Sequence, residues 1–286
     1  MDSPLVVVVG GANVDVKART AAPLVRATSN PGTVVRTPGG VGRNVAENLA
    51  RLGSRVALVS VVGSDPDGDW LLAETEAAGV DVAPVLRGGV TGRYVAVLDA
   101  GGDLAVGVSD RAATDAVIPE ALDLDLLRSA ALVVVDGNLP VPTIDAVLAL
   151  GVRALIDPVS VAKAGRIAPL LSGDRAVFAL TPNEDELAAL GSVAALHERR
   201  VEVVWVRRGA AGSLLSTREG DVDLAAPPTE VVDVTGAGDA MLAAFCHRLL
   251  AGDGLADAAA YGHRAAALTV ASPHTVVPDL HDRMAR

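Results

Sequence analysis

The chain has 286 residues, enough for one large α/β domain or two smaller ones. Half of the residues are hydrophobic and 21% are charged, which excludes an intrinsically disordered protein. The formal net charge is −11. We therefore expect neither a nucleic-acid partner nor an anionic membrane, because their phosphate groups would repel this chain.

The single cysteine, Cys246, cannot form an internal disulfide, which favours a reducing compartment. No apolar run approaches the roughly 18 residues that a membrane span needs. The first residues also lack the basic-then-apolar order of a secretion signal. These features predict a cytoplasmic protein.

Runs of β-branched and other apolar residues recur along the chain and predict strands that are buried on both faces. They lie at Leu5–Val9, Val56–Val62, Ala131–Val135, Ala154–Ile156, Ala176–Leu180 and Val201–Val206. Helical stretches lie between or after them, at Val41–Leu52, Asp67–Ala78, Val141–Leu150, Glu184–Leu190, Ala237–Ala251 and Leu255–Val270. This alternation predicts an α/β fold with a doubly wound, mainly parallel sheet flanked by helices.

Residues 14–37 and 87–108 break this rhythm, because they are strand-like, contain several glycines and are too polar for a central parallel strand. The apolar run Tyr94–Leu98 followed by Asp99–Asp103 predicts a hairpin. We expect both segments to form a small β lid that excludes water from a reacting centre. Two ordinary surface hairpins are the alternative. No linker or repeat divides the chain, so residues 1–286 are expected to form one domain that carries this lid.

The segment Asp233–Asp239 reads Asp-Val-Thr-Gly-Ala-Gly-Asp and opens a predicted helix. Its small residues let a ligand approach the backbone, and a helix start presents unpaired N–H groups to an anion. Asp239 lies in the first turn, where its carboxylate can take a proton. This combination suits phosphoryl transfer. The alternative is a glycine-rich turn in which Asp239 only interacts favourably with the helix dipole.

Two common nucleotide motifs are absent from the sequence. No G-x-x-x-x-G-K-[ST] pattern occurs, which excludes a P-loop enzyme, and the run Gly10–Asn13 does not continue as G-x-G-x-x-G. A dinucleotide-dependent oxidoreductase is therefore disfavoured, and any nucleotide must bind in another way.

Four segments, taken together and in this order, resemble signatures of the ribokinase-like (PfkB) family of sugar and nucleoside kinases. The matching segments are Gly11–Asp15, Pro38–Asn44, Thr181–Glu186 and Asp233–Asp239. Within the family, three segments are most similar to the pseudouridine kinases: Thr28–Gly32, Pro38–Ala50 and Asp157–Ala164. The resemblance implies an ATP-dependent kinase acting on the 5′-hydroxyl of a nucleoside, with pseudouridine as the expected substrate. A kinase for another nucleoside or a sugar such as ribose or a fructose phosphate is the alternative, as is a non-catalytic nucleoside-binding regulator on this scaffold.

The resemblance assigns roles to residues near the reacting atoms. Asp239 would be the base for the substrate hydroxyl, and the anion hole would comprise Gly236, Ala237 and Gly238. The substrate would be bound by Asn13, Asp15, Gly39, Gly40, Asn44 and Asn138. Asn13 and Asp15 follow a buried strand, so an Asx turn is the alternative there. A turn residue is likewise the alternative for Asn138.

The resemblance also implies a nucleotide and metal side of the site. The residues concerned are Asn183, Glu186, Arg207, Gly209, Gly212 and Thr235. Glu186 would hold Mg²⁺ through water, although Asn183 and Glu186 also fit a helix capping pair. Arg207 stands where the family often has a small hydroxyl residue, so it either meets an ATP phosphate or faces solvent.

Three further points follow from the same comparison. Asp233 and Thr235 resemble residues around a monovalent-cation site, and K⁺ binding is left open because Ala271–His274 lacks the usual Gly-Ala step. Lys163 could approach the donor phosphates or the base, but a solvent-facing helix residue is the favoured interpretation. A homodimer through the lid strand Tyr94–Leu98 is a further expectation.

Overall fold

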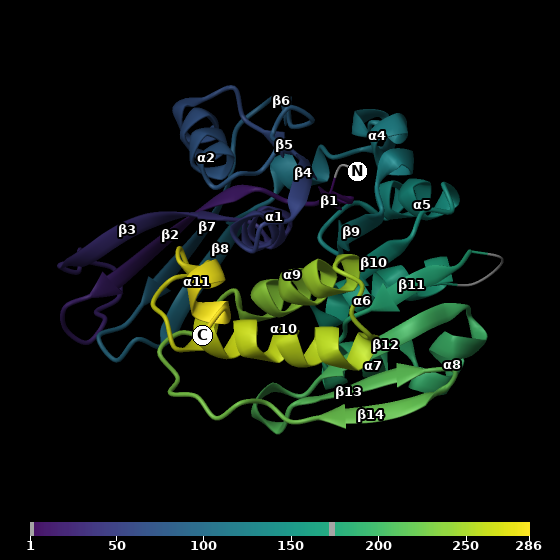
Figure 1. Cartoon of the computed structure of the whole chain (residues 1–286). Helices are drawn as coiled ribbons and strands as arrows, with labels where there is room; N and C mark the ends of the chain where they lie inside the picture. Colours follow the sequence, from purple (N-terminus) through teal and green to yellow (C-terminus); the bar gives the residue numbers. More distant parts are fainter. Residues whose placement is uncertain (1–2, 172–174) are drawn as a thin grey trace.

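The computed structural model describes residues 3–171 and 175–286. Within these ranges, eight strands form the main sheet in the order β14-β13-β12-β11-β10-β9-β1-β4 (Figure 1). Its strands are β1 (Leu5–Val9), β4 (Arg55–Val59), β9 (Leu132–Asp136), β10 (Ala154–Asp157), β11 (Val177–Leu180), β12 (Val201–Arg207), β13 (Ser213–Thr217) and β14 (Gly220–Leu224). The six neighbouring strands β12, β11, β10, β9, β1 and β4 are parallel, whereas β13 and β14 form an antiparallel edge.

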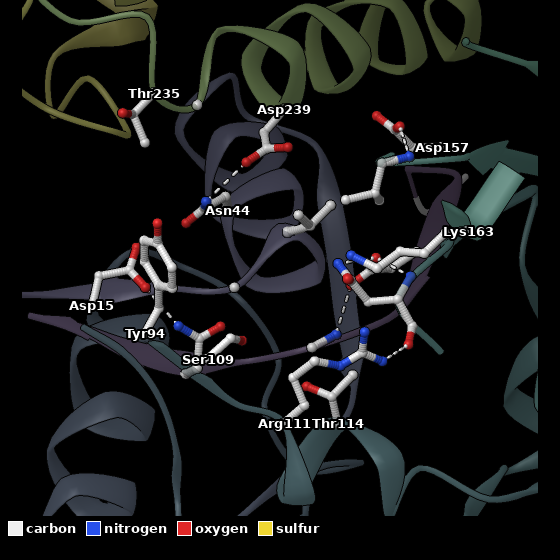
Figure 2. Close-up of a pocket in the computed structure, with 18 of the residues that line it drawn as sticks. Asp15, Asn44, Tyr94, Ser109, Arg111, Thr114, Asp157, Lys163, Thr235 and Asp239 are labelled. Atoms are coloured by element: carbon white, nitrogen blue, oxygen red, sulfur yellow. Dashed lines mark hydrogen bonds between the residues drawn. The ribbon is translucent and has the colours of Figure 1, made fainter. Parts of the chain in front are cut away.

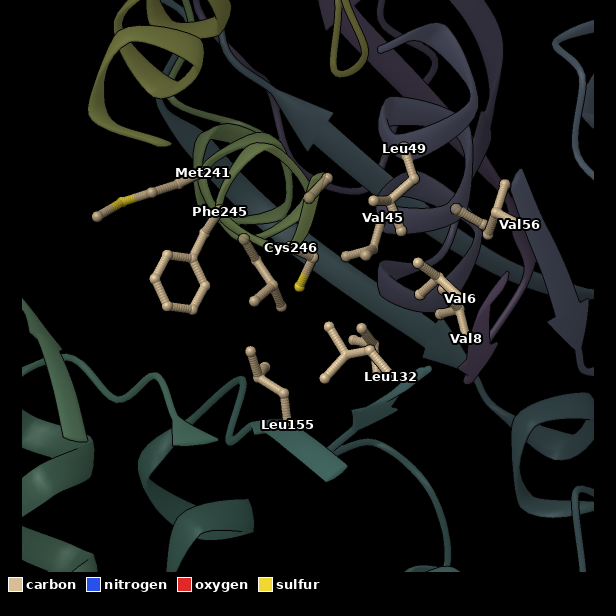
Figure 3. Packing of buried hydrophobic residues seen from close by; sticks show 14 of the residues in the cluster. Val6, Val8, Val45, Leu49, Val56, Leu132, Leu155, Met241, Phe245 and Cys246 are labelled. Carbon is tan, nitrogen blue, oxygen red and sulfur yellow. The ribbon is translucent and has the colours of Figure 1, made fainter. Parts of the chain in front are cut away.

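Alternate residues of the central strands enter two separate cores. In β1, Val6 and Val8 belong to one apolar cluster, while Val7 and Val9 belong to the other. A strand buried on both faces requires such a continuous apolar run, and this explains the predicted pattern. Figure 3 shows the first cluster, in which β1 packs beneath α1 and α9.

Helices cover both faces of the main sheet, which confirms the doubly wound α/β prediction. The first face is covered by α1 (Val41–Arg51), α2 (Pro66–Ala77), α9 (Ala237–Leu250) and α10 (Leu255–Val270). The second is covered by α4 (Leu124–Ser129), α5 (Val141–Ala149), α6 (Val161–Ile167), α7 (Glu184–Leu190) and α8 (Val193–Glu198). Shorter elements are α3 (Ala112–Asp115), α11 (Leu280–Met284), η1 (Pro119–Ala121), η2 (Ala168–Leu171) and η3 (Gly209–Ala211). In the described ranges, no helix has the length and apolar character needed to cross a bilayer.

A second, four-stranded sheet projects to one side of the molecule (Figure 1). We call it the small sheet; its strands are β2 (Asn13–Thr20), β3 (Gly32–Gly39), β7 (Gly92–Leu98) and β8 (Leu104–Asp110), in the order β3-β2-β7-β8. The two segments that were predicted to leave the main sheet form it, and the predicted hairpin is β7–β8. A short parallel pair, β5 (Val61–Val62) and β6 (Leu86–Arg87), forms a two-stranded sheet of its own.

Candidate active site

A cavity of about 380 Å³ lies where the carboxyl ends of β1, β9 and β10 meet the starts of α1 and α9 and one face of the small sheet (Figure 2). Ligands of open α/β sheets collect at this edge, because the connections there diverge and leave a crevice. Asp239 and Asp15 lie on different walls of the cavity, and Asn44 lies between them.

A chain of hydrogen bonds fixes the orientation of Asn44. The Arg43 guanidinium donates from Nη2 to Asn44 Oδ1 at 2.5 Å, and Asn44 Nδ2 donates to Asp239 Oδ2 at 2.8 Å. Arg43 is only 1% exposed and also pairs with Glu47 on the same helix. Because Arg43 occupies the oxygen of the Asn44 amide, the nitrogen of that amide is the group that faces Asp239.

Gly40 permits this arrangement at the start of α1. Its φ is +96°, a backbone conformation that favours glycine, and a Cβ there would lie 2.4 Å from the carbonyl oxygen of Gly11. The end of β1 and the start of α1 can therefore approach each other directly. This close approach brings Asn44 to the wall of the cavity.

Asp239 occupies the first turn of α9 and is half-buried in the cavity wall. Burial raises its pKa to about 7, and the carboxylates of Asp157 and Asp136 act in the same direction. The Asn44 hydrogen bond and the Arg207 guanidinium oppose this rise. A carboxyl group with such a pKa is close to half ionised at neutral pH, which suits a group that accepts a proton.

The start of α9 presents unpaired backbone donors beside this carboxylate. Gly236 caps the helix with φ +80°, and a Cβ there would lie 2.1 Å from the carbonyl oxygen of Thr275. Ala237 N donates to the Val234 carbonyl at 3.3 Å, whereas the N–H groups of Gly238 and Asp239 have no acceptor among the described residues. An anion could bind these free donors at the positive end of the helix dipole.

The small sheet supplies the opposite wall. Its pairing sets Asp15, Tyr94 and Ser109 side by side on β2, β7 and β8, and all three line the cavity (Figure 2). Asn13 Nδ2 donates to Asp15 Oδ1 at 2.6 Å, and both residues begin β2 rather than a turn. Burial raises the pKa of Asp15 against the opposing effect of Asn13. The oxygens of the Asp15 carboxylate can accept hydrogen bonds from a bound hydroxyl group, because Asp15 lines the cavity.

Two other predicted substrate residues differ in their position. Asn138 lines the cavity and also caps its own turn, because Asp136 Oδ1 accepts from both Asn138 N and Nδ2 at 2.8 Å. Gly39 is not part of the lining; a Cβ there would lie 2.3 Å from the Asp15 carboxyl carbon. Gly39 therefore leaves room for the Asp15 side chain and does not itself contact the cavity.

Arg207 ends β12 and does not face solvent. Its guanidinium forms two 3.0 Å hydrogen bonds with Asp157 and lies 3.5 Å from Glu186. Glu186 in turn forms a capping box with Asn183 at the start of α7. Gly209 and Gly212 lie in the turn that follows β12. The residues Asn183, Glu186, Gly209 and Gly212 do not line the cavity, whereas Arg207 and Thr235 do.

The carboxylate of Glu186 is suited to a hydrated metal ion rather than to direct coordination. Both of its oxygens accept hydrogen bonds from Asn183, at 2.9 and 3.1 Å, and Oε2 also lies 3.5 Å from Arg207 Nη2. Mg²⁺ usually keeps several water ligands, so an outer contact from this carboxylate fits it. In the described ranges, no cluster of three or more His, Cys, Asp or Glu side chains could hold a metal ion.

The side chains of the predicted monovalent-cation site are already paired. Asp233 Oδ2 accepts from Lys17 at 2.9 Å, and Asp233 Oδ1 accepts from Thr235 N and Oγ1 at 2.9 and 2.6 Å. Thr235 also lies at the cavity wall. These side chains therefore provide no free ligand for K⁺, and its binding stays a prediction.

The favoured interpretation of Lys163 as a solvent-facing residue is wrong. The side chain crosses from α6 into the cavity, is half-buried, and has no hydrogen-bond acceptor among the described residues (Figure 2). Burial lowers the pKa of Lys163. The short helix α6 gave no amphipathic pattern from which this inward direction could be predicted.

The lining residues that were not predicted from the sequence include Tyr94, Ser109, Arg111 and Thr114. Tyr94 and Ser109 reach the site through the strand register of the small sheet, which the sequence does not fix. Arg111 Nη2 donates to the carbonyl of Asn138 at 2.6 Å, and this contact joins the segment after β8 of the small sheet to the segment after β9 of the main sheet. Its position shortly after the predicted lid segment 87–108 was the one signal for Arg111 in the sequence.

Comparisons with known proteins identify the fold and the family. The pfkB family carbohydrate kinase model matches residues 3–282. The chain belongs to this family. The pseudouridine kinase of Escherichia coli K12 is 32% identical, with 96% of this chain and 93% of that protein aligned. Ribokinase of Bacillus subtilis is 31% identical over 84% of each chain.

Solved structures agree with this assignment. A ribokinase of Arabidopsis thaliana complexed with ribose and ATP superposes with a TM-score of 0.84 and 26% identity, covering 99% of both chains. A carbohydrate kinase from Agrobacterium tumefaciens superposes with a TM-score of 0.87 and 28% identity, covering 99% of this chain and 96% of that one. The PfkB chain therefore has a ribokinase-like fold throughout, as the sequence motifs predicted.

Proposed function

We propose that this PfkB-family chain is an ATP-dependent kinase that phosphorylates the 5′-hydroxyl of a nucleoside, with pseudouridine as its substrate. One observation carries the proposal. The Asp239 carboxylate, with a pKa of about 7, and the free N–H groups at the start of α9 meet at one wall of a cavity whose opposite wall carries Asp15. A proton acceptor beside an anion site, facing a hydroxyl-binding carboxylate, is the arrangement that phosphoryl transfer needs.

In the proposed reaction, Asn13, Asp15 and Asn44 bind the ribose, with Gly40 allowing the close approach of the backbone. The 5′-hydroxyl gives its proton to Asp239 while its oxygen forms a bond to the γ-phosphorus. The bond from that phosphorus to ADP breaks, and the electron pair leaves with ADP. The free N–H groups of Gly238 and Asp239 stabilise the charge on the phosphoryl oxygens. Glu186 would hold Mg²⁺ through water, and the ion would supply positive charge that neutralises the phosphates.

The small sheet is proposed to act as a lid over the substrate. Asp15, Tyr94 and Ser109 lie on its inner face, so a ribose beneath them is shielded from water. We do not assign a nucleobase contact to the segment Thr28–Asn30, because the Asn30 side chain is hydrogen-bonded within its own loop to Val25 and Thr28. Ser109, at the cavity wall, is a better-placed hydrogen-bond partner for the extra ring N–H of a C-glycoside.

A substrate panel tests the proposed function. We expect ATP consumption to be fastest with pseudouridine when ribose, uridine, adenosine, fructose 6-phosphate and pseudouridine are compared at equal concentrations. Equal rates for uridine and pseudouridine would contradict the proposed substrate but retain the kinase. Tight pseudouridine binding by calorimetry with no ADP formed from any compound would instead indicate a non-catalytic nucleoside-binding regulator.

We also propose that two copies of the chain associate through the small sheet. Its face opposite Asp15 carries a cross-strand row of Val34, Ala18, Val97 and Val106. Val34 is 71% exposed and Val106 is 51% exposed. The expected lid strand Tyr94–Leu98 is an inner strand, so the exposed apolar side chains come mainly from its neighbour β8 and from β3. A second copy would cover this face.

A further inference from the structure

The guanidinium of Arg207 is held in one orientation at the end of β12. Its Nη1 and Nη2 donate in parallel to the two oxygens of Asp157, each at 3.0 Å, and Nη2 lies 3.5 Å from Glu186. The side chains of Asp157 and Glu186 are 4% and 3% exposed, and that of Arg207 is 17% exposed. A planar, bidentate pair of this kind fixes both the position and the plane of the guanidinium.

The Arg207 guanidinium also lies against the start of α9. A Cβ added to Gly238 would be 2.8 Å from Arg207 Nη1, so the glycine leaves the space in which this cation lies. The Nε–H of Arg207 has no acceptor among the described residues. Arg207 and Asp239 both line the cavity, and the free N–H groups of Gly238 and Asp239 belong to the helix start against which the guanidinium lies.

We propose that Arg207 is a catalytic residue of the phosphoryl transfer and that Asp157 is its positioning residue. Arg207 donates to a non-bridging oxygen of the transferring phosphoryl group, which lies roughly perpendicular to the line of the bonds that form and break. It keeps all of its protons throughout; the hydroxyl proton goes to Asp239, and the electron pair of the broken bond leaves with ADP. This inference rests on the proposed function and adds a cation of the chain itself to its anion site.

Arginine suits this position better than a lysine would. One edge of the planar group can bind a carboxylate while the other edge binds a phosphate oxygen, whereas an ammonium has no fixed second edge. The competing explanation is that Arg207 only balances the charges of Asp157 and Glu186. The two explanations predict different kinetics, because a counter-charge would not contact the phosphoryl group.

Kinetics of Arg207→Ala and Arg207→Lys test the inference. We expect kcat to fall by at least about 100-fold in Arg207→Ala, the low end for the loss of one preorganised donor at a developing anion. The Kd of ADP should change less than twofold, because the contact is with the transferring group. Arg207→Lys should recover only a small part of kcat. Added guanidinium chloride at millimolar concentration should partly restore Arg207→Ala, whereas sodium chloride or urea should not.

Arg208→Ala is the matched control. Arg208 is the next residue along the chain, pairs with Asp223 at 2.7 Å and does not line the cavity. Its removal should leave kcat within about twofold. Equal kcat values for Arg207→Ala and Arg208→Ala would overturn the inference, as would a loss of ADP affinity that matches the loss of kcat.

Two further results separate folding and function from this role. If Arg207→Ala does not fold, the double variant Arg207→Gln with Asp157→Asn removes both charges of the Arg207–Asp157 pair, and we expect the same loss of kcat in a protein that melts cooperatively. A wild-type kcat in that double variant would overturn the inference. If the wild-type chain itself transfers no phosphate to any compound of the panel, the proposed function fails, whatever Arg207 contributes to ADP binding.

Discussion

The side-chain amide of Asn44 donates a 2.8 Å hydrogen bond to the carboxylate of Asp239, a residue 195 positions away in the chain. The bond joins the start of α1 to the first turn of α9. Arg43 holds the amide in the orientation that makes it the donor. The nucleoside side and the phosphate side of the proposed site are therefore coupled through one amide group.

Replacement of Asn44 by alanine should move the pH dependence of the reaction. The hydrogen bond lowers the pKa of Asp239, so its loss raises that pKa and keeps the carboxyl protonated to higher pH. We expect the acid limb of the kcat/KM profile to shift upward and kcat/KM at pH 7 to fall about 10-fold, as the loss of a charged hydrogen bond predicts. Asn30→Ala, in an exposed loop, is the control. An unshifted profile in Asn44→Ala would show that the bond does not tune the base.

Asp65 should contribute to stability at neutral pH but not in acid. It caps α2 and accepts hydrogen bonds from Thr91 Oγ1, Thr91 N and Gly68 N. The Thr91 side-chain bond is the main reason that the pKa of Asp65 is lowered to about 2. The folded state therefore binds the Asp65 proton more weakly than the unfolded state, and this stabilisation is lost as the pH falls from about 4 to about 2.

We expect Asp65→Ala to reduce the free energy of unfolding by about 1 kcal/mol at pH 7, a typical value for a lost helix cap. The difference from wild type should shrink as urea titrations are repeated at pH 4 and pH 3. Asp69→Ala is the control on the same helix, since the Asp69 side chain is 71% exposed. If the difference in the free energy of unfolding stayed constant down to pH 3, the stabilisation would not come from the ionised Asp65 carboxylate.

The exposed apolar face of the small sheet should control the oligomeric state. Light scattering at micromolar concentration should give a dimer for the wild-type chain and a monomer for Val106→Asp, because a charge would have to be buried in the interface. Val222→Asp alters an exposed residue of β14 in the other sheet and should leave the dimer intact. A monomeric wild-type chain would contradict the proposed association.

Local sequence signals predicted the helices that begin at a recognisable capping residue. The helix Glu184–Leu190 matched because Asn183 and Glu186 form a capping box, and the helix that opens after Gly236 matched because glycine permits its left-handed cap. The hairpin β13–β14 was not predicted, since its strands are short and lie at an antiparallel edge of the main sheet.

Within the site, the sequence motifs predicted where each functional residue lies in its own helix or strand, but not which of these residues contact one another. Asp239 could be placed at a helix start, yet its bond to Asn44 depends on how α1 and α9 pack over the sheet. Tyr94 reaches the cavity only because β7 pairs with β2 in a particular register. The inward direction of Lys163 depends on the packing of α6, which no local pattern encodes.

The folding of Asp239→Asn needs its own control before its activity is measured. Burial raises the pKa of Asp239 to about 7, so the folded state binds this proton more tightly than the unfolded state. Stability therefore falls as the pH rises from about 4 through 7, where the buried group must ionise. Asp239→Asn carries no such charge and should melt at a higher temperature than wild type at pH 8.

The most direct test of the account is the turnover number of Asp239→Asn, measured with saturating ATP and the best nucleoside of the panel. Without the carboxylate, no group beside Asn44 takes the hydroxyl proton, and we expect kcat to fall by at least about 100-fold. The Kd of ATP should remain nearly unchanged. A variant that turns over at close to the wild-type rate would contradict the assignment of Asp239 as the base.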